Sequence, residues 1–82
     1  MNLVSVRHDN LVDADRIVAI VVPGTMSAKR IIGFAKERGL FIDCCHSHRQ
    51  RSVAVFDTGH VLISSLKPST LRERIEEGLK SG

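Results

Sequence analysis

The sequence has 82 residues, a net charge of +3 and a calculated isoelectric point of 9.3, which together indicate one small, mildly basic domain. Its two adjacent cysteines, Cys44 and Cys45, exclude a disulfide framework and favour a reducing, cytoplasmic compartment. The longest apolar run, residues 17–22, is far shorter than the roughly 20 residues of a membrane helix, so no membrane partner is expected.

The N-terminal part of the chain predicts strands. Weak alternation over residues 2–6 favours a first strand, and the polar residues 8–15 indicate a turn region with a short extended piece. The run over residues 16–22 is continuous and β-branched, which is typical of a central strand buried on both faces. Pro23 and Gly24 form a turn signal that ends this strand.

A helix is predicted to follow this turn. Ser27 is placed as its N-cap, and the helix is expected to reach Arg38. Gly39 then takes the position after the helix, where a positive φ is needed. At the helical period one face is apolar and consists of Ala28, Ile31, Ile32 and Ala35.

The second half of the chain predicts three further strands. Residues 40–43 read as a short strand, and residues 44–50 as a loop or the end of that strand. Residues 51–57 and 61–65 are predicted to form a hairpin around the Thr-Gly pair between them.

A second helix is predicted at the C-terminus. Pro68 suits its first turn, and residues 80–82 are expected to fray. Its narrow apolar stripe consists of Leu71, Ile75 and Leu79. Residues 1–82 are therefore expected to form one α+β domain, with a small mixed or antiparallel sheet of four to five strands. The two helices are expected to cover one face and self-association the other, because so small a domain has a marginal core.

The densest cluster of reactive side chains lies in the segment CCHSHRQRSV, residues 44–53. A metal-binding or thiol-dependent protein would use Cys44, Cys45, His46 and His48. These residues fall in one short segment, whereas a structural zinc site draws two pairs of ligands from separate segments. Packing of the cysteines in the core is therefore favoured. No metal, cofactor or small-molecule substrate is expected, and the chain is not expected to be an enzyme.

Basic residues gather in the middle of the chain. Between residues 27 and 56 they are Lys29, Arg30, Lys36, Arg38, Arg49 and Arg51. Such a cluster suits the phosphate backbone of a nucleic acid, although a solvated helix face has a similar pattern. Single-strand RNA binders stack bases on exposed aromatic rings, and all three phenylalanines here are assigned to the core. A nucleic-acid partner is therefore expected to be duplex.

The order of several segments resembles that of a known family. Between residues 10 and 74 the chain contains, in order, LVDADRIVAIV, KRII, AKERG, FID, HRQR and HVLISSLKPSTL. This order is similar to the RemA family of bacterial extracellular-matrix regulators, also known as a domain of unknown function. The resemblance implies a small DNA-binding transcription regulator of the biofilm matrix. It also implies assembly into a homo-oligomeric ring, with arginines around the ring and duplex DNA following it.

The resemblance further implies which residues bind DNA. Arg16 matches an arginine that precedes the first buried strand of the family. The basic loop of the family reads glycine, arginine, arginine, threonine, arginine, and Arg49 and Arg51 match two of its arginines. His48 replaces an arginine, so it adds charge only when protonated, and Ser47 replaces a glycine. A structural assembly protein that binds an acidic partner through the same residues stays open as an alternative.

Overall fold

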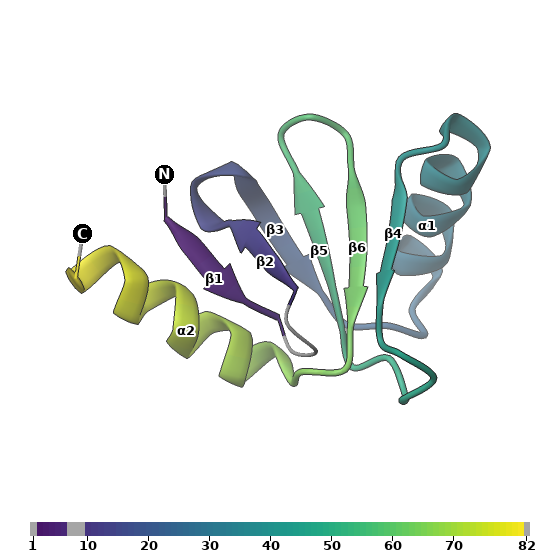
Figure 1. Cartoon of the computed structure of the whole chain (residues 1–82). Helices are drawn as coiled ribbons and strands as arrows, with labels where there is room; N and C mark the ends of the chain where they lie inside the picture. The colour runs from purple at the N-terminus through teal and green to yellow at the C-terminus, as the bar shows by residue number, and fades with distance from the viewer. Residues whose placement is uncertain (1, 7–9, 82) are drawn as a thin grey trace.

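The computed structural model describes residues 2–6 and 10–81, which form two α-helices and two β-sheets (Figure 1). A four-stranded sheet has the strand order β3-β5-β6-β4, and β1 and β2 form a separate two-stranded sheet. The strands are β1 (Leu3–Ser5), β2 (Leu11–Asp13), β3 (Ile17–Val21), β4 (Phe41–Cys44), β5 (Ser52–Phe56) and β6 (Val61–Ser64). The helices are α1 (Met26–Arg38), α2 (Pro68–Ser81) and the short 3-10 helix η1 (Ala14–Arg16).

The larger sheet is mixed. β3 pairs with β5 and β5 with β6 in antiparallel fashion, whereas β6 and β4 run parallel. The α+β class, the mixed sheet and the β5–β6 hairpin are thereby confirmed. The larger sheet has four strands, within the predicted four to five, but the separate two-stranded sheet was not expected: the predicted turn region contains β2, which pairs with β1. Residues 8 and 9 of that region lie outside the described residues.

The apolar run of β3 forms an edge strand and not the predicted central one. Val18 is 65% exposed, and the pairing register of β3 with β5 shifts between Ile17 and Ala19, which places Val18 at a bulge. The strands buried on both faces are β5, with Val53 and Ala54, and its neighbour β6. The prediction failed because an edge strand with exposed apolar residues has the same continuous pattern as a central strand.

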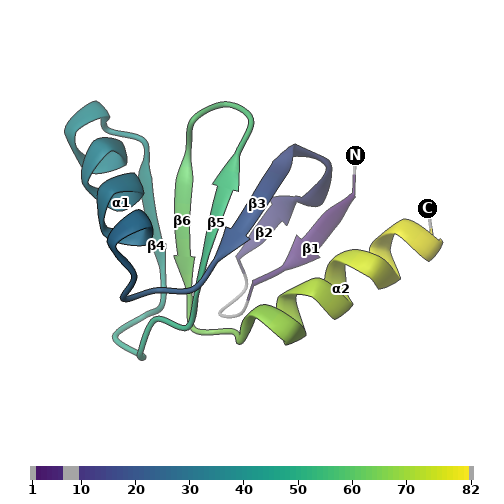
Figure 2. The ribbon, with the colours of Figure 1, turned by 180° about the vertical axis from the view of Figure 1, so that it is seen from behind.

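The two helices cover opposite faces of the larger sheet. The cluster beneath α1 consists of Ala35, Cys45, Val53, Val61 and Ile63, and the cluster beneath α2 and β1 consists of Val6, Cys44, Leu62, Leu66 and Leu71. Val61 and Leu62 are neighbours on β6 and belong to different clusters, so the clusters lie on opposite faces. Figure 2 shows α1 beside β4 at one side of the molecule and α2 beside β1 at the other. The prediction that both helices share one face is therefore wrong, since β6 offers an apolar side chain to each.

The first turn of α1 begins earlier than the sequence indicates. Its N-cap is Thr25, which has extended backbone angles (φ −81, ψ 160). The Thr25 Oγ1 accepts a hydrogen bond from the Ala28 N–H at 3.1 Å. The assignment of Ser27 as the N-cap is wrong, because serine and threonine are both favoured N-caps and the two candidates lie within one turn.

The other helix ends agree better with expectation. Gly39 follows α1 with φ 72, and Pro68 opens α2, as predicted. The helix continues to Ser81, into the tail that was expected to fray, and Gly82 lies outside the described residues. Phe34 of α1 is 57% exposed, so its assignment to the core is wrong. Within the described residues, each helix lacks the length and apolar character that crossing a bilayer requires.

Three connections emerge at one end of the larger sheet. β3 leads to α1 through residues 22–25, β4 leads to β5 through residues 45–51, and β6 leads to α2 through residues 65–67. β3, β4 and β6 point in the same direction and β5 in the opposite one, so all three connections meet at this end (Figure 1, lower edge).

Candidate nucleic-acid interface

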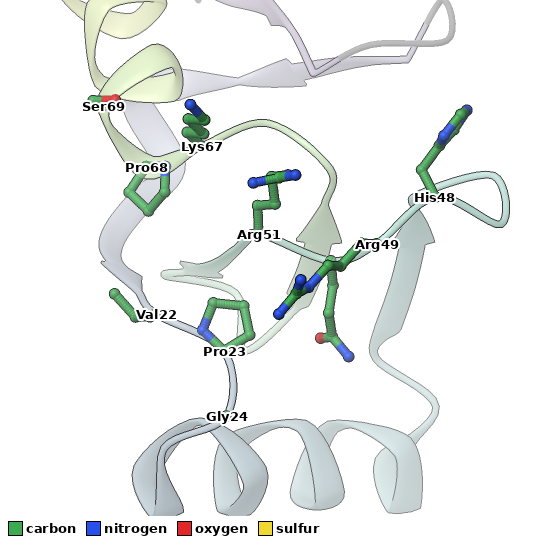
Figure 3. Close-up of a pocket in the computed structure, with 10 residues that line it drawn as sticks. Val22, Pro23, Gly24, His48, Arg49, Arg51, Lys67, Pro68 and Ser69 are labelled. Carbon is green, nitrogen blue, oxygen red and sulfur yellow. The ribbon is translucent and has the colours of Figure 1, made fainter.

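An open cavity of about 890 Å³ lies where the three connections meet (Figure 3). Pro23 contributes from the first connection, Arg49 and Arg51 from the second, and Lys67 from the third. His48 also lines the cavity. Three of the four residues predicted to bind DNA are thus brought together on one surface, together with a lysine that sequence reasoning did not select.

A tight turn directs the basic segment into this cavity. The His48 N–H donates to the Cys45 carbonyl at 2.9 Å, and both central residues of the turn have positive φ, 49 at His46 and 70 at Ser47. Two positive φ values suit a type I′ turn, in which glycine and asparagine are the favoured residues. After the turn, the Arg51 N–H donates to the Ser64 carbonyl at 2.8 Å and returns the chain to the sheet. The arginines are therefore presented from a short segment fixed at both ends.

Among the described residues, the arginines and the lysine of the cavity form no ion pair, whereas Arg16 and Arg72 do. Among the side chains that the structure describes, no carboxylate forms an ion pair with Arg49, Arg51 or Lys67, and all three are exposed. By contrast, Arg72 pairs with Glu76 on α2 at 3.4 Å. Unpaired cations on one concave surface create a positive field that attracts anions.

Arg16 lies at the opposite end of the sheet. It precedes β3, whereas Val22, at the far end of that strand, lines the cavity. Six residue steps at about 3.3 Å each separate the two positions by about 20 Å, which an arginine side chain does not span. The Arg16 guanidinium contacts the Asp57 carboxylate at 3.4 Å and the Asp13 carboxylate at 3.9 Å. Within one chain, Arg16 and the cavity arginines do not share a surface.

The sequence contained a signal for Lys67, its position before a predicted helix start, but this signal was not used to select it. It stands immediately before Pro68, which was recognised as the start of a helix. The residue before a helix is its N-cap, where serine, threonine, aspartate and asparagine are favoured and lysine is unusual. A basic residue at this position is the feature that would have placed Lys67 among the candidates.

The cysteines of the metal or thiol alternative pack in the core. Cys44 and Cys45 are buried in separate clusters. Burial, aided by the Asp43 carboxylate, raises the pKa of the Cys44 thiol and raises that of Cys45 from 9.0 to about 11. Both thiols are therefore protonated at neutral pH, which suits neither nucleophile nor metal ligand. The part of the chain that the structure describes brings no three metal-ligating His, Cys, Asp or Glu side chains together.

Comparison with known proteins identifies the family of the chain. Residues 3–75 match the family RemA-like, described as "Extracellular matrix regulatory protein A-like". A relative from Symbiobacterium thermophilum is 43% identical over 75 residues, which are 92% of this chain and 79% of the relative. One from Dictyoglomus thermophilum is 41% identical over 80 residues, or 98% and 94% of the two chains, and one from Caldicellulosiruptor saccharolyticus is 39% identical over 77 residues, or 94% and 76%.

These relatives carry the name "Putative regulatory protein", and the family name also refers to regulation. The match covers nearly all of the described secondary structure, from β1 into α2. The resemblance seen in the order of the sequence segments is thereby confirmed, and the chain belongs to the RemA-like family.

Proposed function

We propose that this protein is a transcription regulator that binds duplex DNA through phosphate contacts from arginines repeated around a homo-oligomeric ring. The names of the family and of the relatives support a regulatory role and not an enzymatic one. The observation that carries DNA binding is the convergence of Arg49 and Arg51 in an open cavity, without carboxylate partners among the described side chains.

The chemistry of the cavity favours phosphate. The planar guanidinium of arginine donates two parallel hydrogen bonds to phosphate oxygens, and two such groups line the cavity. The cavity lining contains no Phe, Tyr or Trp side chain on which an unpaired base could stack. Contacts to phosphate position a protein on duplex DNA without reading bases, so sequence preference would arise from the shape and bending of the DNA.

A single chain offers too few cations for strong DNA binding, and self-association would multiply the number of cations that contact one DNA duplex. Two or three cations per chain give weak, salt-sensitive binding, whereas copies held together bind with an increased effective concentration. Apolar surface supports such an assembly: Val18 and Val22 are exposed on the edge strand β3 and beyond its end, as are Met26 and Phe34 of α1. A second cavity of about 450 Å³ is mainly apolar and includes Ile42 in its lining. A ring requires two different complementary surfaces on each chain, and these regions are candidates.

Substitution of Arg49 tests the proposed function. Arg49→Ala should weaken binding to unrelated duplex sequences and should flatten the dependence of log K on log salt by about one for each subunit that touches DNA. Arg72→Ala is a control with the same change in charge, because Arg72 lies on α2 in an ion pair. Affinity is measured by fluorescence anisotropy at several salt concentrations, with the mass of the protein measured in parallel.

Two results would contradict the proposal. If Arg49→Ala binds as tightly as the wild type with an unchanged mass, the cavity is not the DNA surface. If the wild type binds no duplex DNA even at low salt, the alternative of an acidic protein partner becomes the better explanation of the unpaired cations.

A further inference from the structure

We propose that neighbouring subunits join by docking the outer face of α1 of one copy into a groove between β3 and α2 of the next copy. This inference rests on the proposed function, and it names the two surfaces of the chain that form the contact in the ring. The occupant of the groove is therefore a second copy of this chain. The contact joins two different surfaces and is not a symmetric contact of α1 with α1.

An open groove of about 380 Å³ lies beside the free edge of β3. β3 forms one wall, and α2 forms the other through Arg72, Ile75 and Glu76. The rest of the lining is aliphatic and consists of Ala14, Ile17, Val18, Ala19 and Ile20. Among the described strands, β3 pairs with β5 alone, so its other edge exposes backbone groups as well as Val18. Covering such an edge with a helix is one of the ways in which proteins protect it.

α1 exposes apolar side chains on the face that points away from the core. Its buried residues are Ala28 and Ala35. Met26 and Gly33 are seven residues, or about two turns, apart, so they follow one line on the opposite side of the helix. Phe34 flanks this line, and both it and Met26 are more than half exposed. Large apolar side chains that share one exposed surface favour a protein contact there.

Gly33 is an independent sign that another chain packs against α1. Glycine inside a helix destabilises the helix relative to alanine. Gly33 lies in the middle of α1 without a positive φ, and a Cβ built on it would meet no other part of the described chain within 4 Å. Packing within one subunit therefore does not explain a glycine at this position. A partner that lies directly on the helix backbone does, because a missing side chain permits close approach.

The charges of the two surfaces are complementary. α1 carries four cations, Lys29, Arg30, Lys36 and Arg38, and the single carboxylate Glu37. On the groove side, α2, η1 and the residues in contact with Arg16 carry the carboxylates Asp13, Asp15, Asp57, Glu73, Glu76 and Glu77.

Three arginines accompany these carboxylates, and each is engaged within its own chain. Arg16 contacts Asp13 and Asp57, and Arg72 pairs with Glu76. Arg74 donates to the Ser5 carbonyl at 3.0 Å. The basic α1 is therefore attracted to the groove side of another copy and repelled by a second α1.

The two surfaces lie at opposite edges of the sheet. The groove follows β3, the first strand of the order β3-β5-β6-β4, whereas α1 lies beside β4, with the Lys36 Nζ 4.9 Å from the centre of the Phe41 ring. Figures 1 and 2 show α1 at one side of the molecule and α2 at the other. Contacts between different surfaces repeat from copy to copy and form a ring when the rotation closes. Copies placed edge to edge keep the same strand ends on one side, so the cavities with Arg49 and Arg51 share one face of the ring.

Two substitutions at exposed positions test this contact. Phe34→Glu blocks the α1 surface and leaves the groove intact, whereas Val18→Glu blocks the groove and leaves the α1 surface intact. Each variant alone should have the 9.1 kDa mass of one chain in light scattering. An equimolar mixture should form a dimer of about twice that mass, because one intact α1 meets one intact groove and no further copy can add. Phe34→Leu keeps the apolar character and is the control that should assemble as the wild type does.

Three results would overturn the inference. They are a mixture that stays monomeric, a Phe34→Glu variant that assembles as the wild type does, and a wild type that is monomeric at micromolar concentration. A symmetric contact of α1 with α1 would give the first of these results, because every Val18→Glu chain would then pair with its own kind.

Substitution of Gly33 separates a role in the contact from a role in the fold. In the Val18→Glu background, Gly33→Ala should raise the unfolding midpoint in urea, because alanine favours the helix. In the otherwise wild-type chain it should weaken assembly by about tenfold, because even a methyl group overpacks a close contact. A lower unfolding midpoint in the Val18→Glu background, or unchanged assembly, would mean that the glycine does not serve close approach of a partner.

Titration with duplex DNA distinguishes failure of this inference from failure of the proposed function. If the mixture forms the dimer but the assembled wild type binds no duplex DNA, the docking contact stands and the proposed function fails. If Phe34→Glu assembles and binds DNA as the wild type does, the docking contact is refuted and the DNA interface stands.

Discussion

At the scale of single residues, the segment that carries the basic loop contains two buried thiols beside exposed cations. Cys44 and Cys45 belong to the cores on opposite faces of the sheet. This explains why they are adjacent: successive residues at the end of β4 point to opposite sides, and both sides are apolar. The cluster of cysteines and histidines is therefore a strand end in the core followed by a surface turn.

The raised pKa of Cys45 predicts a loss of stability at high pH. Burial, together with the Asp43 carboxylate, raises the thiol pKa from 9.0 to about 11 in the folded chain. Between these values the unfolded chain has lost a proton that the folded chain keeps, so stability is complete below the lower value and falls as pH rises through the window. The decrease should approach about 1.4 kcal/mol per pH unit.

Urea unfolding on both sides of that pH window measures this effect. Cys45→Ala should show a smaller decrease than the wild type, because only Cys44, whose pKa is also raised, still contributes. An identical pH dependence in both proteins would mean that the Cys45 thiol is not desolvated as described.

At the scale of elements, the start of α1 is stabilised by the side chain of its N-cap residue, Thr25. Thr25→Ala should lower the free energy of unfolding by about 1 kcal/mol, because the Ala28 N–H loses its acceptor. The Thr25 hydroxyl also donates to the Val22 carbonyl at 3.3 Å, which links the helix start to the end of β3. Ser27→Ala, two residues further along the chain, should cost less than about 0.5 kcal/mol. Urea denaturation of both variants decides between the two caps, and a larger loss for Ser27→Ala would contradict the structure.

The elements also show how far the sequence alone could lead. The β5–β6 hairpin, the end of α1 at Gly39 and the start of α2 at Pro68 were predictable, because turn and helix-end signals depend on local backbone preferences. The edge position of β3 was not predictable, because a continuous apolar run does not show which strands will pair with it.

The residues of the candidate site were likewise only partly predictable from the sequence. Arg49 and Arg51 were recognised from their place in a basic loop. Lys67 lies far from them in sequence and joins them only because β6 ends beside the start of β5. Arg16 was grouped with them, yet the direction of β3 places it at the other end of the sheet, beside Asp57.

At the scale of the whole molecule, the distribution of charge and apolar surface points beyond one chain. One end of the sheet holds the unpaired cations of the cavity, and the other holds Arg16 in contact with Asp13 and Asp57. A chain of 9.1 kDa buries little core, yet it exposes apolar residues on the free edge of β3. An exposed apolar edge strand is a surface for pairing with another chain.

Substitution of Val18 links that edge to DNA binding. Light scattering at micromolar concentration should give the wild type a mass several times the 9.1 kDa of one chain. Val18 is 65% exposed, so Val18→Glu should leave the circular dichroism spectrum unchanged while a charge at the edge strand opposes assembly. Because the cavity stays intact but is no longer repeated, DNA affinity should fall by about a hundredfold or more. Val18→Thr keeps the branched shape without the charge and should stay assembled. A wild type that is monomeric and binds DNA as tightly as Val18→Glu would refute the ring, and the phosphate contacts of one chain would then have to account for all of the affinity.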